Sequence, residues 1–257
     1  MPYNILVTGG AGYLGSIIVP DLLAAGHKVT VLDNFMFKQT SLNHCCHDEN
    51  FKVVKGDIRE KDTMSSLMKS VDVIIPLAAL VGAPLCKLDP IGATTTNSGA
   101  IKLMLKLLSN EQIVLMPTTN SAYGTGGKDN FCNEESTLRP ISQYAMEKVE
   151  VEKELMQHAN AISFRLATVF GMSPRMRIDL LVNDFTYRAV NDRFVVLFES
   201  HFKRNYIHVR DVSKVFQHAL NKHDSMKGQI FNVGLSDANV SKKELCENIQ
   251  KHLPDFI

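Results

Sequence analysis

Tyr144 and Lys148 are the two residues of this chain whose types and spacing point most directly to chemistry. Residues four apart on a helix share a face, so the lysine ammonium would lie near the tyrosine phenol. A neighbouring positive charge favours the phenolate and lowers the pKa of tyrosine from about 10 toward neutral pH. We therefore expect the pair to act as a general base. The alternative is an exposed Tyr and Lys on an ordinary helix, and only the surrounding sequence favours the base.

A hydroxyl-rich string lies upstream of this pair, where an apolar strand expected at residues 112–117 ends. The string is Thr118-Thr119-Asn120-Ser121, and Thr119 precedes Tyr144 by 25 residues. Ligands of open α/β sheets bind at the carboxyl ends of the strands, so these hydroxyls would face a substrate.

A glycine-rich stretch near the N-terminus indicates a dinucleotide site. Residues 3–33 contain an apolar strand, the turn GGAGYLG at 9–15, a helix with apolar residues at helical spacing, and a second strand. Gly9 permits a tight turn, Gly12 lets the backbone approach a pyrophosphate, and Gly15 lets the helix pack on the strand. Amide groups at the helix N-terminus would then face the anion. A tight turn in any α/β protein is the alternative, but the flanking strand and helix favour a cofactor site.

The end of the second strand predicts which dinucleotide binds. Asp33 stands where a carboxylate accepts hydrogen bonds from the adenosine ribose, and it would repel a 2′-phosphate. The following Asn34 and Phe35 supply no arginine to neutralise that phosphate. The expected cofactor is therefore NAD rather than NADP.

Composition limits the other classes of function. The 257 residues are 45% hydrophobic and 21% charged with a net charge of +1, which gives no electrostatic reason for a nucleic-acid or membrane partner. The longest apolar run, at 73–82, is about half the roughly 20 residues of a membrane span. Five cysteines without paired spacings indicate reduced thiols and a cytoplasmic protein. His44-Cys45-Cys46-His47 has ligand types but lacks the usual two-residue spacer, so no metal site is expected.

The pattern of elements predicts an α/β protein with a Rossmann-type doubly wound parallel sheet and a smaller C-terminal substrate lobe. Residues 1–165 are expected to complete the NAD-binding sheet and to carry the catalytic residues, and 166–257 to form a partial substrate lobe interleaved with it. Further elements are expected as strands at 51–55, 71–77 and 229–233 and as helices at 94–109, 180–191, 209–222 and 241–253.

The strings TGGAGYLGS, YAMEK at 144–148 and RNYIH at 204–208 resemble the extended short-chain dehydrogenase/reductase family, and the resemblance covers the whole chain from Tyr3. Members of that family mostly act on nucleotide-linked sugars. The resemblance implies that Thr119 hydrogen-bonds the sugar hydroxyl, that Tyr144 is the base, and that Lys148 also holds the nicotinamide ribose.

The same resemblance extends the site. Asp57 and Ile58 match the segment that contacts adenine, Asn97 matches an asparagine that braces the active site, and Arg204 matches a phosphate ligand. The expected cofactor-binding residues are Gly9, Gly12, Tyr13, Leu14, Gly15, Asp33, Asn34, Asp57, Ile58, Leu77, Ala78, Ala79, Asn97, Tyr144 and Lys148. The expected substrate contacts are Thr119, Ser121, Arg175 and Arg204, with Arg177 as an assistant and solvated surface arginines as the alternative for Arg175 and Arg177. A homodimer through helices 94–109 and 142–160 is implied as well.

Two departures from the family pattern stand out. Thr168 replaces an asparagine that relatives place after the sixth strand, which leaves one substrate contact in doubt. Relatives also continue beyond the position of Ile257, so the resemblance implies either a fragment or a shortened variant.

The leading prediction is an NAD-dependent nucleotide-sugar epimerase that works through a transient keto-sugar. The alternatives are a 4,6-dehydratase or decarboxylase, a keto-sugar reductase, and an NAD-binding regulatory or scaffold protein. Related dehydratases carry acidic residues directly after the catalytic threonine, whereas this chain has Asn120 and Ser121. Glu134 and Glu135 are acidic candidates from elsewhere in the chain, but they fall in a polar loop where solvation is expected. Because related reductases mostly use NADPH, Asp33 disfavours that alternative.

Overall fold

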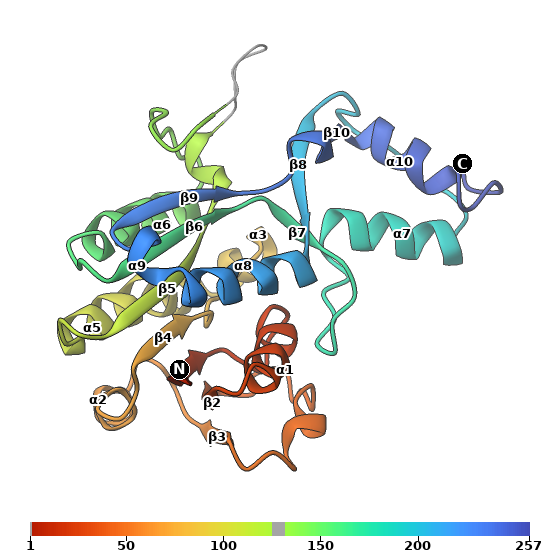
Figure 1. Ribbon diagram of the computed structural model, residues 1–257. Coiled ribbons are helices and arrows are strands. Elements are labelled where there is room, and N and C mark those ends of the chain that lie inside the picture. Colours follow the sequence, from red (N-terminus) through yellow and green to blue (C-terminus); the bar gives the residue numbers. More distant parts are fainter. Residues whose placement is uncertain (1, 125–131) are drawn as a thin grey trace.

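A seven-stranded parallel sheet forms the centre of the computed structural model, which describes residues 2–124 and 132–257. The strand order is β3-β2-β1-β4-β5-β6-β9, so successive strands run outward in both directions from the β1–β4 pair (Figure 1). The strands are β1 (Asn4–Thr8), β2 (Lys28–Asp33), β3 (Phe51–Lys55), β4 (Val73–Pro76), β5 (Ile113–Thr119), β6 (Ala161–Leu166) and β9 (Gln229–Val233). This architecture confirms the prediction of a Rossmann-type doubly wound sheet.

Helices cover both faces of the sheet because alternate strand residues point to opposite sides. On one face, α1 (Gly15–Ala24) and α8 (Val209–Asn221) pack on Ile5, Val7 and their neighbours, which form one buried cluster. On the other face, α2 (Lys61–Met68), α5 (Ala100–Leu107) and α6 (Gln143–Leu155) pack on Leu6 and its neighbours. No helix within the described ranges is long and apolar enough to cross a membrane.

Several element boundaries differ from those expected. The helix predicted at 94–109 begins earlier, because α4 (Pro90–Thr94) continues through a π-helical turn, η2 (Thr95–Gly99), into α5. The helix that carries Tyr144 ends at Leu155 rather than 160. The strand expected at 71–77 is shorter, and α10 (Lys242–Gln250) is shorter than 241–253. Short elements that the sequence patterns did not single out are α3 (Ala83–Leu88), η1 (Asn43–Cys45), η3 (Asn120–Tyr123), α9 (His223–Met226) and η4 (Ser236–Ala238).

A second, smaller lobe stands beside the sheet (Figure 1). It contains the three-stranded sheet β10-β8-β7, formed by β7 (Thr168–Phe170), β8 (Lys203–His208) and β10 (Asn239–Ser241), together with α7 (Leu181–Asn191) and α10. Phe185, Tyr206 and Leu245 form its core. The expectation that the large sheet is complete by about residue 165 was wrong, since β9 pairs with β6 as its seventh strand. The chain leaves the large sheet after β6 and returns to it.

Close backbone packing fixes the turn after β1. Gly9 has φ +67°, and a Cβ atom on it would lie 2.6 Å from the backbone of Ala78, which follows β4. A Cβ atom on Gly15 would overlap the carbonyl of Gly10. Only glycine allows this turn to lie between the ends of two neighbouring strands.

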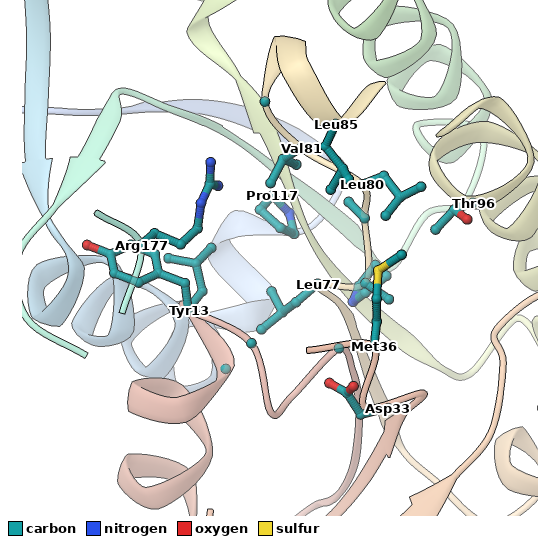
Figure 2. Close-up of a pocket in the computed structure, with 18 of the residues that line it drawn as sticks. Tyr13, Asp33, Met36, Leu77, Leu80, Val81, Leu85, Thr96, Pro117 and Arg177 are labelled. Atoms are coloured by element: carbon teal, nitrogen blue, oxygen red, sulfur yellow. The ribbon is translucent and has the colours of Figure 1, made fainter. Parts of the chain in front are cut away.

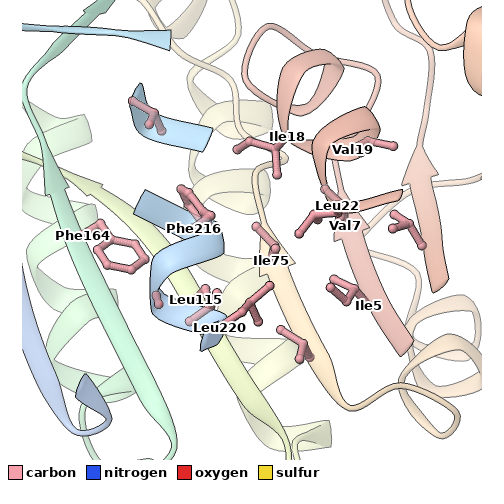
Figure 3. Close-up of a cluster of buried hydrophobic side chains, with 14 of the residues drawn as sticks. Ile5, Val7, Ile18, Val19, Leu22, Ile75, Leu115, Phe164, Phe216 and Leu220 are labelled. Atoms are coloured by element: carbon pink, nitrogen blue, oxygen red, sulfur yellow. The ribbon is translucent and has the colours of Figure 1, made fainter. Parts of the chain in front are cut away.

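Phe216 provides a test of how α8 is held on the sheet. Its ring is fully buried, 5.1 Å from that of Phe164 on β6 in an edge-to-face arrangement (Figure 3). We expect Phe216→Ala to lower the free energy of unfolding by about 3–5 kcal/mol, because it leaves a cavity between α8 and β6. Urea denaturation measures this loss. Phe194→Ala, at an exposed side chain, serves as the control and should change stability by no more than about 0.5 kcal/mol.

Candidate active site

A cavity of about 680 Å³ opens at the carboxyl edge of the large sheet. Its walls come from the turn after β1, the ends of β2, β4 and β5, the first turns of α6, the end of β6, and residues between 167 and 180 that follow it. Asp33 and Met36 lie at its lower end in Figure 2, and Val81, Leu85 and Pro117 at its upper end. The strand order reverses between β1 and β4, and this is where open α/β sheets bind ligands.

Most residues expected at the site line this cavity. They are Gly9, Gly12, Tyr13, Leu14, Gly15, Asp33, Asn34, Asp57, Ile58, Leu77, Ala78, Ala79, Thr119, Tyr144, Lys148, Arg175 and Arg177. Thr168, which departs from the family pattern, lines it as well. Three expected residues, Asn97, Ser121 and Arg204, are not among the lining residues.

Asp33 is held at the end of β2 by the chain itself. Its Oδ2 accepts a hydrogen bond from the amide of Ala11 at 3.0 Å, and its Oδ1 accepts from the amide of Phe35 at 2.8 Å and from the side chain of Gln39 at 3.3 Å. A carboxylate has about four acceptor sites, so capacity remains for a ribose hydroxyl. Together with the glycine turn, this arrangement fits the adenosine half of a dinucleotide.

Tyr144 and Lys148 share one face of α6, as predicted from their spacing. The Nζ atom of Lys148 lies 5.9 Å from the centre of the Tyr144 ring. Burial lowers the pKa of Lys148 to about 8, although the charge of Glu147 opposes this shift. Lys148 is buried and lines the wall of the cavity.

The expected lowering of the tyrosine pKa was wrong for the ligand-free chain. Burial raises the pKa of Tyr144 to about 12, and the neighbouring Cys86 thiol adds to the shift. Removing the phenol from water therefore outweighs the charge of Arg177, which acts to lower this pKa. A phenolate near neutral pH needs further positive charge in the cavity.

Thr119 ends β5 with its side chain prepared to donate. Its Oγ1 accepts a hydrogen bond from the amide of Ser121 at 3.1 Å and so caps the short helix η3. Because that bond uses a lone pair of the oxygen, the hydroxyl proton stays available to a ligand. Ser121 itself is exposed and contributes its backbone to this cap rather than its side chain to the cavity wall.

Asn97 does not line the cavity but holds a segment that does. Its side chain is buried, and it forms two hydrogen bonds with the backbone of Leu80: the Leu80 amide donates to Oδ1 at 2.8 Å and Nδ2 donates to the Leu80 carbonyl at 2.9 Å. The π-helical turn η2 carries this asparagine. The segment after β4 is thereby fixed along the cavity.

The three arginines have different partners. The Arg175 guanidinium lies 4.3 Å from the centre of the Phe37 ring, near the Asp33 end of the cavity, in a cation–π contact. Arg177 forms an ion pair with Asp179. Arg204 is exposed on β8. Arg175 and Arg177 therefore line the same cavity, whereas Arg204 is not among its lining residues.

The second lobe contacts the glycine turn through hydrogen bonds that no sequence pattern predicts. The Ser173 hydroxyl lies 2.6 Å from that of Ser16 and donates to the Tyr13 carbonyl at 2.8 Å, while the Tyr13 hydroxyl donates to the Gly171 carbonyl at 2.7 Å. Asn183, buried on α7, donates to the Tyr13 hydroxyl at 3.3 Å. These partners are separated by more than 150 residues, and no local pattern marks them.

No group of three or more His, Cys, Asp or Glu side chains in residues 2–124 and 132–257 is arranged to hold a metal ion. Cys45 is buried in η1 next to the exposed Cys46, and both are free thiols.

Comparison with known proteins identifies similar chains. Residues 5–234 match the family model described as the NAD dependent epimerase/dehydratase family. A trifunctional UDP-glucose 4,6-dehydratase/3,5-epimerase/reductase of Arabidopsis thaliana is 25% identical over 96% of this chain. UDP-glucuronic acid decarboxylase 1 of Xenopus tropicalis is 26% identical over 97% of it. The chain spans 39% and 57% of the lengths of these two proteins.

Among solved structures, the UDP-glucose 4-epimerase of Thermotoga maritima with UDP-glucose superimposes with a TM-score of 0.85. It is 25% identical to this chain, and the match covers 98% of this chain and 82% of that one.

The buried lysine predicts a pH-dependent stability cost. Between pH 8 and its ordinary pKa of 10.5, Lys148 is protonated in the unfolded chain but not in the folded one, so its contribution to stability rises with pH across this window. Below pH 8 the protein bears the full free-energy cost of burying the charged Lys148 side chain. We expect Lys148→Met to raise the free energy of unfolding of the ligand-free protein at pH 7 by about 3 kcal/mol, and this gain should vanish above about pH 10.5.

Urea denaturation at several pH values measures this gain. Lys153→Met, at an exposed position of the same helix, is the control and should give no pH-dependent gain. A Lys148→Met protein no more stable than the wild type at pH 7 would contradict the assigned cost of burial.

Proposed function

This chain belongs to the NAD-dependent epimerase/dehydratase family, and from that premise we propose that it is an epimerase of a nucleotide-diphosphate sugar. NAD is its cofactor. The observation that carries the proposal is the convergence of Thr119, Tyr144 and Lys148 on the cavity that also contains the glycine turn and Asp33. A general base, a hydrogen-bond donor and a dinucleotide site in one cavity are what reversible oxidation of a sugar hydroxyl requires.

The residues fit NAD in two respects. Glycine is required at position 9 by the nearness of the Ala78 backbone, which keeps the floor of the cavity free of side chains where a pyrophosphate would lie. Asp33 and Asn34 would hold the adenosine ribose, and Asp57 and Ile58 the adenine. When bound, NAD supplies reversible hydride acceptance and a positive charge near the phenol.

The side chains of the chain supply binding and proton transfer. The Thr119 hydroxyl donates a hydrogen bond to an oxygen of the sugar, and this bond orients the reacting carbon. Tyr144, in its phenolate form, accepts the proton of the sugar hydroxyl and later returns it. With a pKa of about 8, Lys148 is mostly protonated at pH 7, so its ammonium stabilises the phenolate and is available to the nicotinamide ribose.

The residues after Thr119 favour epimerisation over elimination. Loss of water after oxidation needs a second acid–base group at the sugar, but Asn120 and Ser121 do not exchange protons near neutral pH. The Oε1 atom of Glu134 instead accepts a hydrogen bond from the Asn232 amide at 2.6 Å, and its side chain is exposed. These contacts support a reaction in which only one proton-transfer residue acts.

A dehydratase or decarboxylase is the second candidate, because two of the similar proteins carry such names. The outcome of a single product analysis separates the two candidates.

We also propose a homodimer through the helices at 94–109 and 142–160. Two apolar side chains on or beside these helices are exposed and support that assembly: Met146 on α6, and Ile91 on α4, which continues through η2 into α5.

The reaction is tested by incubating the protein with UDP-, GDP-, CDP- and dTDP-sugars and catalytic NAD. We expect a stereoisomer of unchanged mass without net NADH, because an epimerase returns its hydride in each cycle. Mass spectrometry and carbohydrate NMR identify the product. A product lighter by one water or by carbon dioxide would reject epimerisation in favour of the second candidate.

Tyr144→Phe tests the assigned base. The substitution removes the proton acceptor but keeps the ring, so kcat should fall by about 100- to 10,000-fold while the affinity for NAD stays within a few-fold. Steady-state kinetics and NAD calorimetry provide the two measurements. Tyr187→Phe on the exposed side of α7 is the control and should keep full activity. Near-normal turnover by Tyr144→Phe would show that another group is the base.

A further inference from the structure

Glu152 and Arg165 form a buried ion pair that the chemistry above does not use. Each side chain is only 3% exposed, and the guanidinium Nη2 lies 2.5 Å from the carboxylate Oε1. Nε of Arg165 also donates to both carboxylate oxygens, at 3.1 and 3.2 Å. A buried pair of this kind adds little to stability compared with an apolar pair. Its role is therefore sought in the groups to which it hydrogen-bonds.

The free edge of the guanidinium reaches the turn that follows Thr119. Nη1 of Arg165 donates to the Tyr123 hydroxyl at 2.8 Å, and that hydroxyl donates to Oδ1 of Asn232 on β9 at 2.7 Å. Tyr123 is the last residue of η3, whose first residues are capped by the Thr119 hydroxyl. Arg165 therefore holds the far end of the short helix that Thr119 begins.

The same nitrogen also contacts Glu134, which lies between η3 and α6 in the sequence. Nη1 of Arg165 donates to the Glu134 carbonyl at 3.1 Å, and the Glu134 side chain accepts from the Asn232 amide. One guanidinium thus binds η3 and the loop that leads toward α6, both against the edge strand β9.

Glu152 connects this arrangement to the proposed base. It stands on α6, eight residues after Tyr144 and four after Lys148, so the three side chains lie along one side of the helix. Its Oε2 accepts a hydrogen bond from the hydroxyl of Thr118, the residue before Thr119, at 3.0 Å. The Glu152 carboxylate therefore links α6, the helix that carries Tyr144, to the end of β5 through a hydrogen bond.

We propose that Arg165, oriented by Glu152, is a positioning residue that aims the Thr119 hydroxyl toward the substrate through the Tyr123 hydroxyl. The inference rests on the proposed function, because it requires Thr119 to act on the sugar. The planar fork of arginine suits this role, since it fixes the directions of several hydrogen bonds at once. An apolar pair of the same volume would fill the space without orienting η3.

Tyr123→Phe breaks the link to η3 but leaves the Glu152–Arg165 pair intact. We expect kcat to fall between about 10- and 100-fold, because small displacements of a reacting group have effects of this size. KM for the sugar nucleotide, affinity for NAD and the midpoint of the pH–rate profile should remain unchanged, since no group that binds the ground state or transfers the proton is removed. Ser213→Ala is the control: it removes a partly buried hydrogen bond to Asp21 between α8 and α1, and it should lower the melting temperature without changing kcat.

A double-mutant cycle with Thr119→Val tests whether Tyr123 acts through Thr119. If it does, Tyr123→Phe should have almost no further effect on kcat in the Thr119→Val background. Unchanged kcat in the single Tyr123→Phe variant, or independent multiplication of the two effects, would overturn the inference. Wild-type protein that turns over no nucleotide sugar would instead refute the proposed function, and this inference with it.

Discussion

The close approach of two backbone segments at the centre of the sheet is the constraint on which the site depends. The turn after β1 and the segment after β4 meet at Gly9 and Ala78, where no room exists for another Cβ atom. Because β1 and β4 are neighbours while their connections run in opposite directions, helices diverge from this point and leave the cavity open between them. Asp33, Thr119 and Tyr144 reach that cavity from strands and a helix that the sheet order arranges around it.

Burial makes this site costly in the ligand-free chain. Lys148 is placed where its charged form is disfavoured, and Tyr144 where its phenolate is disfavoured, so neither group is in its most stable environment. Catalytic residues commonly carry such costs, because a cavity dry enough for hydride transfer is also one that opposes charge. The positive charge of oxidised NAD would favour the phenolate, so cofactor binding and readiness for proton transfer are coupled in the proposed mechanism.

Two kinds of contact hold the site together. The second lobe contacts the glycine turn through Tyr13, Ser16 and Ser173, with neutral hydrogen bonds at the cofactor end of the cavity. Outside the cavity lining, the charged pair Glu152–Arg165 binds Thr118, Tyr123 and Glu134, which lie near the proposed catalytic residues in the sequence. The large sheet anchors the second group, since β6 carries Arg165 and the neighbouring strand β9 carries Asn232, which binds Tyr123.

The sequence by itself determined the features that depend on neighbours along the chain. Gly9, Gly12 and Gly15 lie between a strand and a helix, and the four-residue spacing of Tyr144 and Lys148 places both on one side of α6, because periodicity and turn chemistry act locally. Only the tertiary structure decided which distant segments meet. Tyr13 contacts Asn183 across 170 residues, and Arg175 lies on Phe37 rather than beside Arg204. It also decided the direction of the Tyr144 pKa shift, because burial comes from packing of the whole fold and here exceeds the opposing effect of the Arg177 charge.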